Sequence, residues 1–456
     1  MLDRDTAVAA PGNGSPGLSL EKVGLVSLYL AVFASFFGAA FLSPGIGGIH
    51  FYPYRLSLLW LGLVFFLGLC LRAPVLPGHV LLIRNYLLFL AFWLVYATCH
   101  VFLVQDLGAY VRYTLFLVMG VLLVFLFVYY VRGISSLNTI YWIWVLGLLV
   151  LMGVGLAENL TGHHLQVSEN SLRDPEPWKY VPTATFSMVN QYASFLGLGT
   201  ALVLSLFSLA RRRLPMLGSL LFLLILLYLI NETLSRLNLL AALLQLALAY
   251  FLFFSRSKRR LLLAGFACVF AVSLLMSPNA LWNELGQTRS RIVSVYNQVT
   301  EMHASGRIRV NLVLNGLMFF RDSAGLGVGA GNFNSYMKRD PYFSTSRPDA
   351  PDILFPHNWW IELLSEYGLV VFVGYLLFLL MLFARLLQAY KRATGVREER
   401  IGQMLLLALP GLLIICMAPG YFIAFLPKWL VLAMCLSYVA LDRQKRAQEP
   451  CRSSAP

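Results

Sequence analysis

Charged residues are scarce in this chain. Only 12% of its 456 residues are Asp, Glu, Lys or Arg, about half of the ~25% that is usual in soluble domains. Hydrophobic residues make up 59% of the chain, and the mean hydropathy is +0.72. This composition excludes an ordinary soluble domain and predicts a polytopic membrane protein.

Paired cysteines and a cleavable leader are also missing. The six cysteines have no spacing typical of a metal site or a disulfide framework, so we expect no disulfide, no metal and no cofactor. The first ~20 residues are polar and rich in glycine, and the apolar run after them is long enough to span a membrane. We therefore expect the first helix to remain as a signal anchor.

Long apolar runs are what the sequence has instead. Counting stretches of roughly 17 to 25 residues gives about twelve candidate membrane helices. Their approximate bounds are 23–42, 56–71, 80–103, 109–131, 139–157, 187–210, 214–231, 237–254, 261–277, 360–387, 402–418 and 422–441. Because the lipid interior admits helices but no open sheet, the fold class is all-α, and residues 1–456 form a single transmembrane helical-bundle domain.

Basic residues orient this bundle, because short basic loops resist translocation across the membrane. They gather in alternate connections, which are Arg72 with Arg84, Arg132, Arg211 to Arg213, Arg256 to Arg260, Lys391 to Arg400, and Arg443 to Arg446. These connections and both termini are expected in the cytoplasm of a bacterial cell. The net charge of +14 then reflects topology, and we expect the lipid bilayer and no nucleic acid as a partner.

Two long connections, 158–186 and 278–357, lie on the predicted outer side. Function concentrates in loops of this length. Within the second, residues 305–320 have the apolar spacing of a short amphipathic helix, with Ile308, Leu312 and Phe319 on one side. We expect 278–357 to be a large extracytoplasmic loop that carries part of an active site.

A lone histidine stands where this loop enters the tenth span. His357 precedes Asn358, which can cap the following helix, and Glu362 and Glu366 follow at i,i+4 spacing. An imidazole with a pKa near ~6.5 is a suitable general base for a hydroxyl nucleophile. His357 is therefore either a catalytic residue, which Glu362 or Glu366 would orient, or an ordinary surface residue.

Ionisable and amide side chains also occur beside other apolar spans. Glu232 and Arg236 lie in a hairpin between two spans, where charges are costly and therefore candidates for function. A structural pair at i,i+4 on one helix is the alternative. Asn190 and Gln191 stand where an outer loop enters the sixth span, and either contact a sugar or hydrogen-bond between helices.

Four glycines alternate from Gly325 to Gly331 in the sequence GLGVGAG. This spacing allows a close approach of the backbone or an anion-binding nest. It also allows a tight turn that packs against the membrane face. It does not match the G-x-G-x-x-G dinucleotide pattern.

Three blocks in order carry a resemblance. They are TLSRLNLLAALL around Arg236, GRIRVNLVLNGLMFF followed by GLGVGAGNFNSY, and HNWWIELLSEYGLVVF. These blocks resemble the signature blocks of the O-antigen ligase and Wzy-type polysaccharide polymerase superfamily. Among its branches the chain is most similar to the teichuronic acid biosynthesis proteins. The resemblance covers roughly residues 180 to 390.

The resemblance implies a large GT-C-like fold and a membrane glycosyltransferase in cell-wall polysaccharide biosynthesis. The donor would be a saccharide linked to undecaprenyl pyrophosphate, and the acceptor a sugar hydroxyl on the outer face of the cytoplasmic membrane. Carried over from the family, Arg236 and either Arg307 or Arg309 hold the pyrophosphate, and His357 activates the acceptor. Arg307 fits the family's Gly-Arg pair, whereas Arg309 better fits the distance to the glycine turn. Related chains often have an N-P-N-like pattern where this chain keeps only Asn190 and Gln191.

Such a transfer is expected to be a one-step displacement, which inverts the anomeric centre. A pyrophosphate leaving group needs charge neutralisation more than a proton donor. Arginines can supply the positive charge, so no metal is expected. A polymerase is the favoured reading, with other polysaccharide-assembly proteins as candidate partners. Three alternatives stay open: a ligase, a lipid-linked oligosaccharide flippase or exporter, and a relative of the peptidoglycan-polymerising glycosyltransferases.

Overall fold

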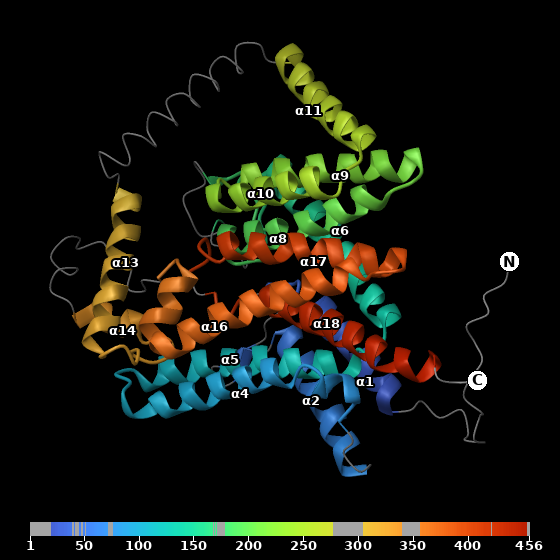
Figure 1. The fold of residues 1–456 in the computed structure, drawn as a ribbon. Coiled ribbons are helices and arrows are strands. Elements are labelled where there is room, and N and C mark those ends of the chain that lie inside the picture. Colours follow the sequence, from blue (N-terminus) through green and yellow to red (C-terminus); the bar gives the residue numbers. More distant parts are fainter. Residues whose placement is uncertain are drawn as a thin grey trace.

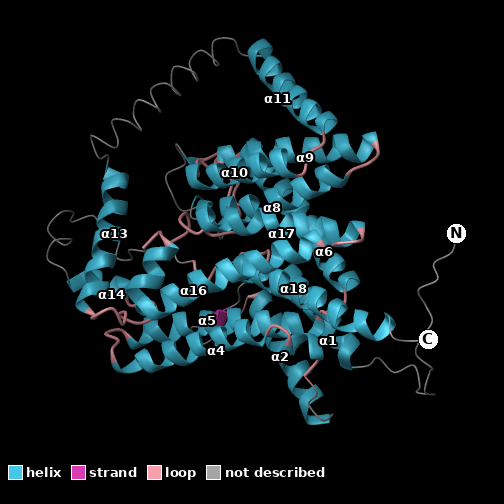
Figure 2. Cartoon of the chain, viewed as in Figure 1, coloured by secondary structure: helices cyan, strands magenta, loops and turns pink. Residues whose placement is uncertain are grey.

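The structure is a computed structural model of the whole chain. It describes residues 20–38, 41, 45–46, 49–50, 52–71, 76–166, 168, 170, 178–276, 304–339, 356–420 and 422–453. In this part of the chain, long helices lie alongside one another and turns join them at both ends of the bundle (Figures 1 and 2). The sheet content is one antiparallel pair of two-residue strands, β1 (Gly45–Ile46) and β2 (Ile49–His50).

The helices follow the predicted apolar runs closely. In chain order they are α1 (Leu20–Ala34), α2 (Pro53–Leu71), α3 (Gly78–Leu81), α4 (Arg84–Cys99), the 3-10 turn η1 (His100–Phe102), α5 (Leu107–Tyr130), α6 (Ile134–Thr161), α8 (Val189–Leu209), α9 (Arg213–Glu232), α10 (Arg236–Leu252), α11 (Arg256–Met276), α13 (Ala304–Asp322), α14 (Phe333–Arg339), α16 (Trp359–Lys391), α17 (Val396–Ile415) and α18 (Leu426–Ser453). Each of the predicted runs corresponds to one of these helices, with α3 and α4 sharing one run.

Within the described residues, seven helices are long and apolar enough to cross a membrane: α2, α4 with η1, α5, α6, α8, α9 and α16. The chain is therefore a multi-pass membrane protein, while the number of twelve spans and the GT-C-like arrangement stay predictions. The first predicted span, 23–42, is too long. Helix α1 ends at Ala34 after 15 residues, and the turn after it brings the Gly38 amide to the Thr185 hydroxyl, 3.3 Å away.

The connections divide between two ends of the bundle. At one end, which we name the α13 end, the η1–α5 turn contacts Asn332, and the α9 terminus contacts Asn159. At the other end, which we name the basic end, Arg392 pairs with Asp442 at 2.6 Å and Arg132 pairs with Glu21 at 2.9 Å. Described basic residues that were expected in the cytoplasm, such as Arg132 and Arg392, lie at this second end, and α18 points the same way, opposite to α13 (Figure 1).

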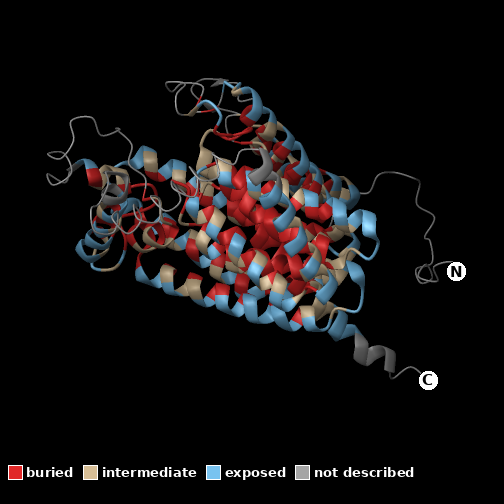
Figure 3. Cartoon of the chain, turned by 90° about the horizontal axis from the view of Figure 1, so that it is seen from above, coloured by how far each residue is buried: buried red, intermediate tan, exposed pale blue. Residues whose placement is uncertain are grey.

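The core runs along the middle of the bundle, and the outward faces of the helices stay apolar and exposed (Figure 3). Helix α8 is buried along most of its length between α9, α10 and α17. Exposed leucines, such as Leu59, Leu221 and Leu380, form a surface of the kind that faces lipid.

Helix α13 lies across the α13 end, at a steep angle to the long helices (Figure 1). Its predicted amphipathic character is confirmed at two positions. Leu312 and Phe319 are buried in a small cluster with Val328, Phe333 and Met337. The side chain of Ile308, and residues 277–303 and 340–355 of the predicted outer loop, lie outside the described residues. The apolar side of α13 thus packs against α14 and the glycine turn.

Candidate functional site

The site is built around a helix that is broken near its start. Asn358 is the N-cap of α16, and its side chain accepts a hydrogen bond from the Trp360 amide at 3.0 Å, as the sequence predicted. The helix is interrupted at Gly368, where φ is 75° and ψ is −177°. The predicted span 360–387 lies within this helix, which is long and apolar enough to cross a membrane, but the helix is kinked near its start. Two helical turns, from Trp359 to Tyr367, precede the main span.

The glycine turn, Gly325 to Gly331, packs onto this break. The amides of Val328 and Gly329 donate to the Ser365 and Glu366 carbonyls at 2.8 and 2.9 Å, carbonyls at the point where the helix is interrupted. A Cβ at Gly327 would lie 2.6 Å from the Glu366 carbonyl oxygen, so the approach requires glycine. Of the predicted readings of this motif, the close approach of the backbone is confirmed, and the turn packs against α16; an anion-binding nest and packing against the membrane face stay predictions.

Glu366 completes the attachment. Its side chain is fully buried, and its two oxygens accept hydrogen bonds from the Gly331 amide at 2.8 Å and the Phe333 amide at 3.3 Å. The same carboxylate thereby holds the start of α14. On the opposite side of the turn, His100 and Tyr96 of the α4–η1 segment contact the Leu326 carbonyl at 2.9 and 3.0 Å. The turn is clamped between α16 and α4.

A second loop, Cys416 to Phe425 between α17 and α18, lies against the first turns of α16. The Trp359 amide donates to the Cys416 carbonyl at 3.1 Å, and Glu362 accepts from the Phe422 amide at 3.0 Å. We name this segment the α17–α18 loop; its residue 421 lies outside the described residues. Both contacts fix the loop to the segment that carries His357.

A buried lysine supports this loop. The Lys428 Nζ lies 3.6 Å from the ring centroid of Trp359, 4.6 Å from that of Phe422 and 4.9 Å from that of Trp429. Its side chain is 1% exposed, and the acidic group that interacts with it electrostatically is Glu362. Burial of a cation is tolerated when aromatic faces and an acid compensate for lost hydration. Lys428 is thus a second tie between the α17–α18 loop and α16.

His357 directly precedes Asn358, the N-cap of α16. Its backbone has φ 47°, a left-handed conformation that is uncommon outside glycine and that clusters at functional sites. Burial lowers the pKa of the imidazole from its ordinary value, and so does the positive charge of Arg309, whereas a hydrogen bond with the Ala418 backbone opposes the shift. A lowered pKa keeps the imidazole neutral at neutral pH, which is the form that accepts a proton.

Arg309 links His357 to the third element of the site. Partial desolvation is the larger cause that lowers the pKa of the Arg309 guanidinium, and the positive charge of Arg236 is the smaller one. The side chain nevertheless remains accessible to solvent. Arg309 comes from α13, and Arg236 is the first residue of α10. Arg309 is therefore within electrostatic range of both His357 and Arg236, which come from distant parts of the chain.

Amide and hydroxyl groups position the start of α10. Ser235 donates to the Asn190 side-chain oxygen at 3.0 Å and accepts from the Asn238 amide at 2.9 Å. Asn190 thus contacts Ser235, the residue directly before Arg236. Gln191 instead accepts from Ser187 at 3.4 Å, in its own segment. Sugar contacts by either residue stay a prediction.

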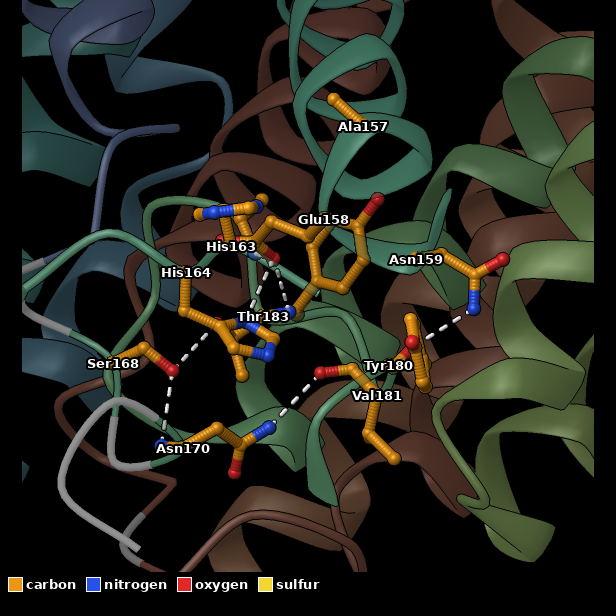
Figure 4. A network of polar contacts seen from close by, with 12 residues as sticks. Ala157, Glu158, Asn159, His163, His164, Ser168, Asn170, Tyr180, Val181 and Thr183 are labelled. Carbon is orange, nitrogen blue, oxygen red and sulfur yellow. Dashed lines mark hydrogen bonds and ion pairs between the residues drawn. The ribbon is translucent and has the colours of Figure 1, made fainter. Parts of the chain in front are cut away.

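The first of the two long connections, 158–186, supports the end of α9, shortly before the start of α10 (Figure 4). Buried Glu158 accepts hydrogen bonds from the Thr183 and Ala184 amides at 2.8 and 2.7 Å, which folds the loop back onto the end of α6. Asn159 donates to the Tyr180 carbonyl at 2.8 Å and to Glu232 at 3.5 Å. Glu232 ends α9 whereas Arg236 begins α10, so the pair on one helix face that was the alternative does not occur.

Other predicted site residues are placed less directly. Glu362 and Glu366 accept hydrogen bonds from backbone amides of the two loops described above, so their connection to His357 is through the backbone. The side chain of Arg307 lies outside the described residues. Sequence reasoning missed Lys428, although a single lysine inside the apolar run LPKWLVLAMCL was a usable signal. It also missed Ala418, whose role depends on backbone geometry alone.

Comparison with known proteins agrees with this construction. Residues 221–376 match the O-antigen ligase family, a range that contains Arg236, Arg309 and His357. Over 436 residues the chain is 27% identical to the teichuronic acid biosynthesis protein TuaE of Bacillus subtilis (strain 168), covering 94% of this chain and 87% of the relative. Residues 221–376 are thus similar to the O-antigen ligase family, and nearly the whole chain is similar to a teichuronic acid biosynthesis protein.

Proposed function

We propose that this protein is a polymerase that transfers a saccharide from an undecaprenyl-pyrophosphate-linked donor to the hydroxyl of a second saccharide. The observation that carries the proposal is the convergence of His357, Arg309 and Arg236 at the α13 end. An imidazole within electrostatic range of Arg309, which in turn is within range of Arg236, suits a reaction that removes one proton and releases one diphosphate. The active site is expected on the extracytoplasmic face of the cytoplasmic membrane.

The guanidinium groups serve the donor. Arg236 and Arg309 are placed to bind diphosphate oxygens, for which the planar fork of arginine is suited. Their positive charges stabilise the negative charge that develops as the bond between the anomeric carbon and the diphosphate oxygen breaks. Arg309 is favoured over Arg307, because its charge acts on His357 and is acted on by Arg236.

The imidazole serves the acceptor. The acceptor oxygen attacks the anomeric carbon, its proton passes to His357, and the polyprenyl diphosphate leaves from the opposite side. The displacement inverts the anomeric centre in a single step, and proton removal by a positioned base contributes about 10²–10⁴-fold to such reactions. The positive charge of Arg309 favours rapid loss of that proton from His357 after the reaction.

The choice of acceptor rests on the comparison with a known protein. The similarity to a teichuronic acid biosynthesis protein favours a growing saccharide chain as acceptor, and a ligase that attaches a finished polymer is the runner-up. Positioning comes from the α17–α18 loop, which Glu362 and Lys428 fix against α16 while its Ala418 backbone holds the imidazole.

The test uses purified full-length protein with a defined lipid-linked saccharide, and measures chain length and released polyprenyl diphosphate. His357→Ala is expected to lower the rate about 10²–10⁴-fold. His163→Ala is the matched control, because this histidine is exposed and, among the described residues, its hydrogen bonds are with the neighbouring Thr161. Full polymer yield from His357→Ala removes the histidine from the mechanism. Unchanged substrate with the wild-type protein, together with lipid translocation in vesicles, identifies a flippase instead.

A further inference from the structure

A large groove lies away from the site, between α2 and α5. Its volume is about 990 Å³. Its lining recurs over fifteen residues of each segment, from Tyr52 to Phe66 and from Gly108 to Leu122, which corresponds to about 21 Å between the first and last residues at a helical rise. The walls are apolar, and Leu59, Leu63 and Phe66 on α2 and Leu115 on α5 are exposed. The groove has the length and character of a seat for a lipid chain.

The two helices run in the same direction along the groove. Arg55 of α2 lies over the ring of Phe116 at 5.7 Å, and farther along, Phe65 contacts Phe125 and Tyr129 at 5.6 and 5.0 Å. The first turns of α2 and α5 therefore lie toward the same end of the groove.

Both cations of the groove lie at that end. Arg112 is one turn before Phe116 on the same face of α5, and Arg55 stacks on Tyr52 at 4.5 Å and on Phe116. Arg112 has no acidic partner among the residues that the structure describes. Asp106, which caps α5, already accepts hydrogen bonds from Ala109 and Ser335. A pair of guanidinium groups at the end of an apolar groove is complementary to a lipid with a phosphate headgroup.

This end of the groove faces the same part of the molecule as the candidate site. Asn332, at the end of the glycine turn, accepts hydrogen bonds from the Gln105 and Asp106 amides at 3.0 and 2.8 Å, directly before α5. Tyr113, which follows Arg112, packs against Gly331, whose amide is held by Glu366 of α16. The glycine turn thus connects the groove arginines to the helix that presents His357.

We propose that the groove between α2 and α5 binds the acceptor lipid, a saccharide carried on a polyprenyl phosphate, with Arg55 and Arg112 on its phosphate. This inference rests on the proposed function, in which two lipid-borne saccharides meet at one membrane face. Arg236 and Arg309 serve the phosphates of one of them. The groove arginines provide a second, separate seat for phosphate at the same end of the bundle, with an apolar channel for one chain below it.

The experiment measures binding without transfer. Wild-type and variant proteins are placed in phosphatidylcholine nanodiscs, and a sugar-free polyprenyl monophosphate is titrated and counted by native mass spectrometry. All variants carry Arg236→Ala and Arg309→Ala, so that the donor seat is removed. Arg55→Gln with Arg112→Gln removes the cations. Gly62→Leu fills the groove, because a Cβ at Gly62 meets nothing within 4 Å.

Gly68→Leu is the matched control, since Gly68 is on the same helix, also meets nothing within 4 Å, and does not line the groove. One bound probe is expected in the background protein and in the control. At least about tenfold weaker binding is expected for the double arginine variant, which loses charge-assisted hydrogen bonds, and for Gly62→Leu.

Unchanged binding in Gly62→Leu overturns the proposal. Displacement of the probe by an equal amount of phosphatidylglycerol also overturns it, because the seat is then a general one for anionic phospholipid. Neither result depends on transferase activity, so failure of the proposed reaction is read separately.

Discussion

The pairing of Arg309 with His357 predicts a specific change in proton binding. The positive charge of Arg309 lowers the pKa of the imidazole, so the unprotonated base persists to more acidic pH than in an isolated histidine. Arg309→Gln removes the charge while keeping a polar side chain of similar length. The pKa of His357 is then expected to rise, and the acid limb of the rate profile is expected to move to higher pH.

Two effects of this variant separate by pH. Since Arg309 remains accessible to solvent, solvent screening limits the effect of its charge on the pKa of the imidazole. At pH values well above both pKa values the imidazole is neutral in either protein. The loss that remains there, about 10-fold or more, measures the missing contact to the donor diphosphate.

The titration is measurable without substrate. Diethyl pyrocarbonate modifies neutral imidazole, and peptide mass spectrometry follows each of the seven histidines separately, with exposed His163 as an internal reference. Arg236→Gln is the matched variant, because its charge acts on Arg309. It is expected to weaken donor binding while leaving the His357 titration nearly unchanged. An identical modification profile for His357 in wild type and Arg309→Gln refutes the placement of the guanidinium beside the imidazole.

Two further predictions concern the support of the site, and both are checked by thermal or denaturant unfolding of purified protein. Lys428→Met is expected to cost about 3–5 kcal/mol, because it leaves Glu362 buried without its cation, and adding Glu362→Gln is expected to restore most of the loss; additive losses in the double variant contradict the pairing. Gly327→Ala is expected to cost about 2–4 kcal/mol, because φ is +93° and the new Cβ would lie 2.6 Å from the Glu366 carbonyl oxygen. Gly68→Ala is its control, and equal stability of the two variants contradicts the close packing of the turn.

Hydrophobic runs predicted the order of the helices well, because the length of an apolar segment is a direct requirement of the bilayer. The side-chain oxygen of Asn358 also caps α16 by accepting from the Trp360 amide, as the position of Asn358 in the sequence indicated. These features are local, since each depends on a few neighbouring residues.

Features that depend on distant contacts were not predictable from the sequence. The break at Gly368 is stabilised by amides some forty residues earlier in the chain, and without them the sequence EYGLVV continues an apolar helix. Glu362 and Glu366 share a helical face with each other, which suggested a role at the imidazole. Their acceptor oxygens are used by two separate loops, because each loop brings buried amides that need partners.

The interruption of α16 accounts for how one helix serves both the bilayer and the reaction. A continuous helix would satisfy the Ser365 and Glu366 carbonyls internally and offer the glycine turn nothing to bind. Because the break releases these carbonyls, the turn attaches there, and α13 and α14 are packed onto it through Leu312, Phe319 and Phe333. Arg309 on α13 and His357 before α16 are therefore positioned by one backbone junction, so their separation does not depend on a direct side-chain bond between them. When the His357 imidazole holds a proton, it and the Arg309 guanidinium are both positively charged and repel each other. The backbone junction therefore has to fix their positions.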